Sequence, residues 1–156
     1  MRRLLPFCVS LLTLPVFAQT ESDQNTEELV SKIIDMGSAF RCAHIASYAF
    51  MRDEEKKLIE VAVHIGRIAF DEYNRIEPRL VILNEKSPYY AVYLGSDVSA
   101  DFALGIISSK ISSEVGEKIE SMVPDSAKST IEGQVESFTR MAEKLYQEEN
   151  CRFMTR

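Results

Sequence analysis

Apolar residues recur at three- and four-residue steps through four long stretches of this chain, the spacing that places them on one face of an α-helix. The pattern predicts helices over about 27–50, 54–73, 100–122 and 129–149. Apolar residues cover most of the circumference of the second stretch, which predicts that this helix lies at the centre. We therefore expect an all-α, four-helix bundle-like domain.

Candidate capping residues and the apolar pattern of the last helix refine the predicted helices. Asp53 and Ser99 are positioned as helix caps, and Ser129 with Glu132 fits a capping box that opens the fourth helix. This last helix carries a narrow apolar seam, typical of an outer bundle helix, made of Ile131, Val135, Phe138, Ala142 and Leu145.

The periodicity changes between the second and third helices, over 78–99. Two apolar, β-branched and aromatic runs flank a turn-rich segment, which predicts a short extended or β-hairpin insertion. Three tyrosines cluster there, Tyr89, Tyr90 and Tyr93. Tyrosine is enriched where proteins bind partners, so these rings form either a partner-binding surface or a lid over the end of the bundle.

The first eighteen residues have the layout of a secretory signal peptide. Arg2 and Arg3 precede an apolar run, and Ala18 offers a small residue for cleavage. The run is too short to cross a bilayer as a helix, so no membrane anchor is expected. We predict that 1–18 is cleaved, that 19–156 forms a single domain, and that the product is periplasmic or secreted in bacteria.

The net charge of the mature chain limits the classes of partner that are expected. Cleavage removes two of the 18 basic side chains and leaves 16 against 24 acidic ones, a net charge of −8. Such a surface repels nucleic-acid phosphates and anionic lipids, so neither is an expected partner. An envelope or extracellular protein is the expected partner.

The two cysteines that remain after cleavage, Cys42 and Cys151, form an even pair in an oxidising compartment. Such a pair predicts a structural disulfide. A redox pair would need thiols close in sequence, and zinc would need more ligands.

Two polar stripes are the strongest candidates for a small-molecule site. Glu60, His64 and Arg67 share one face of the second helix, while Arg41 and His44 share a face of the first. If the stripes meet between the helices, they form a polar cavity that binds a small molecule or serves an enzyme. If they face water, their residues make ordinary surface pairs. No catalytic motif is present in the sequence, and no cofactor or metal is expected.

Two short strings carry a family resemblance, Arg41-Cys42-Ala43 and Asp101-Phe102-Ala103-Leu104-Gly105. They resemble uncharacterised small exported helical proteins of bacteria and phages, for which no activity is assigned. The resemblance implies an envelope setting and no catalytic residue. Together these features predict a non-catalytic binding protein that recognises another macromolecule, as an inhibitor, immunity or accessory factor.

Mass spectrometry of the exported protein without reductant tests the leader and the disulfide together. We expect a chain that starts at Gln19 and is two hydrogens lighter than the dithiol. An intact leader, or free thiols on both cysteines, would contradict the prediction.

Overall fold

The computed structural model describes residues 21–73, 75 and 98–155, and every element in these residues is helical. The elements are four α-helices and two short 3₁₀ helices: α1 (Glu21–Tyr48), α2 (Arg52–Tyr73), α5 (Ala100–Met122), η1 (Asp125–Ser129), α6 (Ile131–Glu148) and η2 (Cys151–Thr155). The predicted all-α, bundle-like architecture is confirmed. The predicted leader and residues 78–97 of the predicted insertion, with Tyr89, Tyr90 and Tyr93, lie outside the described residues.

The helices pack around α1, which contacts α2, α5, α6 and η2. Ala39, Ala43 and Ala46 are completely buried along it, so three neighbouring helices can approach its backbone closely. The expectation that the second helix would be central is wrong. The outer face of α2 is exposed, including Glu60, His64 and Ile68, because only one of its faces meets α1 and α5.

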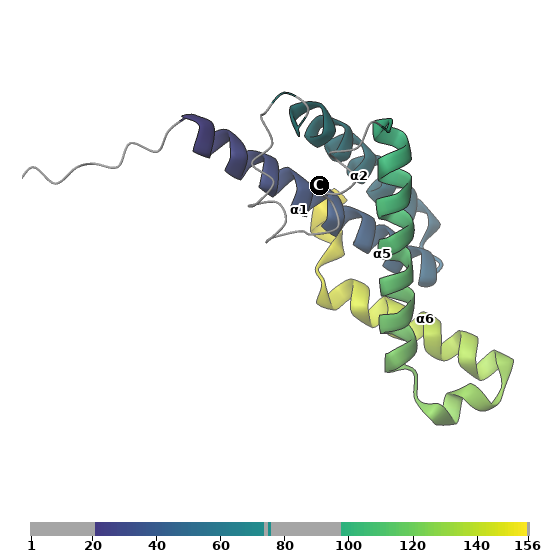
Figure 1. Cartoon of the computed structure of the whole chain (residues 1–156). Helices are drawn as coiled ribbons and strands as arrows, with labels where there is room; N and C mark the ends of the chain where they lie inside the picture. Colours follow the sequence, from purple (N-terminus) through teal and green to yellow (C-terminus); the bar gives the residue numbers. More distant parts are fainter. Residues whose placement is uncertain (1–20, 74, 76–97, 156) are drawn as a thin grey trace, which may run out of the picture.

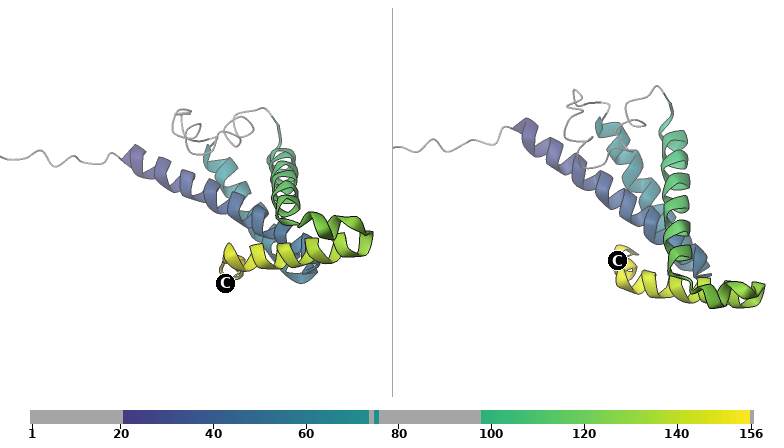
Figure 2. Two further views of the ribbon diagram at one scale, coloured as in Figure 1. Left: turned by 90° about the horizontal axis from the view of Figure 1, so that it is seen from below. Right: turned by 60° about the horizontal axis from the view of Figure 1, so that its bottom comes forward.

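In space, α1 and α2 form a hairpin with α5 beside it, and α6 lies across the C-terminal end of α1 (Figures 1 and 2). The connection through η1 projects beyond the hairpin, at the lower right of Figure 1. The apolar core therefore lies between α1, α2 and α5, and α6 closes it from one end.

Close packing of α2 depends on a glycine. A Cβ added at Gly66 would overlap a methyl group of Leu104 and lie 2.8 Å from the Met36 sulfur. Both side chains are buried and cannot swing into solvent. Gly66 thus allows α2 to approach α1 and α5 at the same point.

The helix ends are close to prediction, with differences at three helices. Asp53 does not cap α2, because the helix begins at Arg52 and Asp53 lies in its first turn. Ser99 caps α5 by accepting a hydrogen bond from the Phe102 amide, as expected. The cap of α6 is Thr130 rather than Ser129, because the Thr130 hydroxyl is the group that accepts from the Gly133 amide. At the other end of the chain, α1 begins at Glu21 instead of Glu27 and ends at Tyr48 instead of Phe50.

Gly66→Ala should lower the free energy of unfolding by about 1–3 kcal/mol through overpacking. Gly105→Ala is the matched control, since a Cβ there meets nothing within 4 Å, and it should raise stability by about 0.5–1 kcal/mol. Urea denaturation of both variants measures the difference. Equal effects at the two glycines would contradict the packing described here.

Candidate functional site

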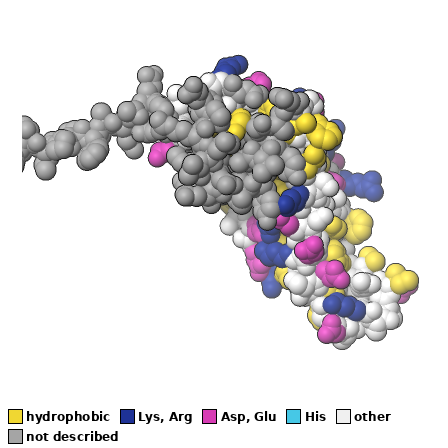
Figure 3. All heavy atoms as spheres, in the orientation of Figure 1, with side chains coloured by type: hydrophobic (Ala, Val, Ile, Leu, Met, Phe, Trp, Pro, Cys, Tyr) yellow, Lys and Arg dark blue, Asp and Glu magenta, His cyan; other side chains and the backbone are white. Residues whose placement is uncertain are grey.

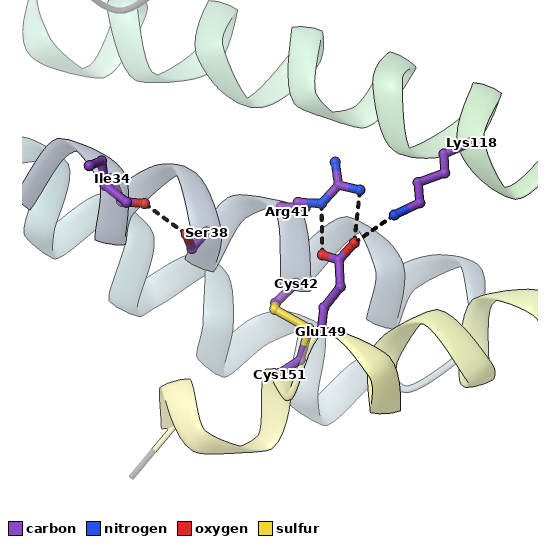
Figure 4. Close-up of a disulfide and its surroundings, with 7 residues drawn as sticks. All are labelled: Ile34, Ser38, Arg41, Cys42, Lys118, Glu149 and Cys151. Carbon is purple, nitrogen blue, oxygen red and sulfur yellow. Dashed lines mark hydrogen bonds and ion pairs between the residues drawn. A yellow bond between two sulfur atoms is a disulfide. The ribbon is translucent and has the colours of Figure 1, made fainter. Parts of the chain in front are cut away.

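A covalent and ionic tether holds the end of α6 against the C-terminal third of α1. As predicted, Cys42 and Cys151 are paired, with sulfurs 2.06 Å apart, and both are buried. Beside the pair, the Arg41 Nε and Nη2 donate to the two carboxylate oxygens of Glu149 at 2.7 and 2.9 Å. Lys118 of α5 donates to the same carboxylate at 3.1 Å, so three helices meet at this point (Figure 4).

The electrostatics of Glu149 follow from this environment. Burial acts to raise the pKa of its carboxyl, but the hydrogen bonds from Arg41 and Lys118 outweigh burial and hold the pKa below its ordinary value. The ionised form is therefore the one that the fold stabilises.

The turn that leads from α6 to Cys151 contains a residue that suits its left-handed backbone conformation. Asn150 has a positive φ of 55°, in the left-handed region that closes a helix C-terminus. After glycine, asparagine is the residue that tolerates this conformation best. The chain turns there at little energetic cost, and the next residue is the disulfide cysteine.

The C-terminus of α1 uses the same conformation with an unsuitable residue. Phe50 has a φ of 57°, and its amide donates to Ser47 O while the Met51 amide donates to Ala46 O. These two bonds define a Schellman motif, in which the left-handed position normally holds glycine. A bulky side chain there is strained by about 1–2 kcal/mol. Phe50 is nevertheless 67% exposed and contributes little to the core.

Phe50 borders an apolar groove between the end of α1 and the first half of α6. The groove has a volume of about 350 Å³ and is lined mainly by apolar surface; its lining residues are Ser47, Tyr48, Phe50, Gln134, Val135, Phe138 and Thr139. Hydrophobic side chains are exposed toward this end of the molecule (Figure 3). We call this feature the α1–α6 groove.

Tyr48 holds the two sides of the groove together. Its ring meets Phe138 edge to face, with centroids 5.5 Å apart and planes at 62°. Its hydroxyl lies over Gly116 of α5, where an added Cβ would be only 2.9 Å away. The floor is thus built from packed aromatic rings.

The apolar seam of α6 continues past the groove, where none of the described helices covers it. Ala142 and Leu145 are buried, as expected for the seam. Val135 is 51% exposed and Ile131 is 82% exposed, so the seam predicted for an outer bundle helix is covered only in part. The reason is the geometry of the tether, which fixes the C-terminal end of α6 on α1 while its N-terminal end projects with η1 (Figure 2).

The predicted polar stripes have separate partners in the structure. Arg41 binds Glu149, and His44 shares a 3.0 Å hydrogen bond with Ser108 of α5. Arg67 pairs with Asp101 on the surface, where both side chains are more than half exposed.

Glu60 and His64 are exposed on α2. Burial lowers the pKa of His44, which favours its neutral form between α1 and α5. The five residues Arg41, His44, Glu60, His64 and Arg67 are therefore not brought together into one cluster.

Other site classes find no support in the part of the chain that the structure describes. No three His, Cys, Asp or Glu side chains are grouped there so that they could hold a metal ion. Among the described helices, none combines the length and apolarity needed to cross a membrane. No protein-family model, curated protein or solved structure that was compared with the chain matches it.

Glu149→Gln should lower the free energy of unfolding by about 1–2 kcal/mol at pH 7, because it replaces a half-buried bidentate pair. Since the folded-state pKa is lowered, this loss is full above the ordinary carboxyl value of 4.5 and disappears as the pH falls through the folded pKa.

Urea denaturation at pH 7 and pH 3 measures this dependence. Asp101→Asn is the control and should have a much smaller effect, because its pair with Arg67 is solvent-exposed. An effect of Glu149→Gln that persists unchanged at pH 3 would contradict the account.

Proposed function

We propose that this protein is a non-catalytic binding protein, exported from a bacterial cell, and that it recognises another protein through the α1–α6 groove. The observation that carries the proposal is Phe50, an exposed aromatic side chain retained at a backbone position where glycine would be more stable. Residues in sparsely populated backbone regions cluster at binding sites, where function opposes the loss of stability.

The apolar surface around Phe50 supports the same conclusion. Phe50, Ile131 and Val135 are each more than half exposed at one end of the molecule, next to a groove with an aromatic floor. Contiguous exposed apolar surface rimmed by polar residues is typical of protein interaction sites. Aromatic anchors supply much of the binding energy at such sites.

The disulfide of the tether is consistent with export from the cell. Cys42 and Cys151 close a loop with a sequence separation of 109, for which chain entropy predicts about 4–5 kcal/mol of stabilisation. Disulfides of this structural kind persist in oxidising compartments. The inhibitor, immunity or accessory roles expected from the sequence all require such a binding surface.

Phe50→Gly tests the proposal, because it should separate stability from binding. Glycine relieves the left-handed strain, so the free energy of unfolding should be unchanged or raised by up to about 1 kcal/mol, while partner capture is lost. Asn150→Gly makes the same backbone change at the end of α6, away from the groove, and is the matched control.

The measurement is quantitative mass spectrometry of proteins retained from the source envelope fraction by immobilised wild type and both variants. We expect a protein retained by wild type and Asn150→Gly but lost with folded Phe50→Gly, and it should then bind the wild type when purified. Retention of the same proteins by Phe50→Gly, with the variant shown to be folded by circular dichroism, would refute the proposal.

A further inference from the structure

The exposed part of α6 carries an acidic stripe directly beside its apolar seam. At 100° per residue, Glu132, Glu136 and Glu143 fall within a narrow sector on one flank of the Val135 face. All three are exposed. The flank of α6 beside the groove therefore carries three carboxylates over three turns, with the exposed Arg140 at its outer edge, four residues after Glu136.

These carboxylates differ from the acidic residues at the other end of α6. Glu148 pairs with Lys144, and Glu149 binds Arg41 and Lys118. Glu132, Glu136 and Glu143 have no side-chain partner among the residues that the structure describes. On the opposite side of the groove, Arg52 and Asp53 follow Phe50 and carry opposite charges, so they do not neutralise the stripe.

The uncovered surface has the residue spacing of a helix–helix contact in which one helix is lacking among the described residues. Ala142 and Leu145 show that the C-terminal half of the seam packs against helical neighbours. Ile131, Val135 and Phe138 continue the seam at the same three- and four-residue steps. A helix that presents apolar anchors at matching spacing would cover them as a bundle neighbour does.

We infer that the occupant of the α1–α6 groove is an amphipathic helix of a partner protein whose apolar anchors are flanked by lysine or arginine. This inference rests on the proposed function and adds the chemistry of the partner. Charge complementarity argues against a second copy of this chain, because facing acidic stripes would repel each other. A cationic helix would instead pair with the unpartnered carboxylates at the rim while its apolar face enters the groove.

Two matched peptides test the inference on the full-length exported chain. One is an 18-residue helical peptide with leucines at i, i+4, i+7 and i+11 and lysines on both flanks. Its twin has glutamate in place of every lysine. Fluorescence anisotropy measures the Kd of each peptide for wild type and for the variants below.

We expect wild type to bind the lysine peptide at least tenfold more tightly than the twin, and Phe50→Gly to lose this binding. Glu132→Lys with Glu136→Lys should weaken the lysine peptide by about tenfold and strengthen the glutamate twin, since each rim charge pair contributes modestly. Asp35→Lys with Asp71→Lys changes the net charge equally at exposed positions away from the groove. It should leave the preference intact.

The contrary outcomes are distinguishable. Equal binding of both peptides, lost with Phe50→Gly, would overturn the cationic partner and leave the proposed function standing. Lysine-peptide binding that Phe50→Gly does not affect, or binding of neither peptide, would also overturn the inference, and the capture experiment would then decide the proposed function alone. A dimer in sedimentation equilibrium that Phe50→Gly dissociates would assign the groove to a second copy and overturn the inference.

Discussion

The tether between α1 and α6 fixes how α6 lies on the other helices, and the candidate binding surface depends on it. The Cys42–Cys151 pair and the Arg41–Glu149 ion pair lie side by side, one covalent and buried, the other ionic and half-buried. Together they fix the C-terminal end of α6 to the C-terminal third of α1. Since one end of α6 is fixed and its other end emerges from η1, the helix crosses the end of the α1–α2 hairpin instead of lying along it.

This crossing leaves the bundle incomplete in a specific place. The seam of α6 is covered near Leu145 and uncovered near Val135, and the uncovered half faces the end of α1 at Phe50. The residues with a left-handed backbone at the C-termini of α1 and α6 differ in the same way. Asn150 suits its backbone and serves the tether, while Phe50 opposes its backbone and is exposed beside the groove. A cost in stability at the second position is understandable if the side chain binds a partner.

The features that depend on local residue patterns and on the cysteine count could be predicted from the sequence. The helix over 100–122, its Ser99 cap and the Cys42–Cys151 pair follow from periodicity, hydroxyl chemistry and an even cysteine count. The candidate groove could not be predicted, because periodicity identifies which face of a helix is apolar and does not say how far a neighbour extends over it. Ile131 belongs to the apolar seam predicted for the fourth helix, and Phe50 ends the first predicted helix, yet both side chains are exposed.

The central claim is that no described helix covers the first half of the α6 seam, so that this surface is open to a partner. Methyl NMR with a soluble paramagnetic probe tests it directly, because the probe broadens only the methyl groups that it can approach. The account predicts strong broadening for Ile131 and Val135 and little for Leu145. Protection of all three methyl groups would contradict it, since another segment of the chain or a second copy would then already occupy this surface.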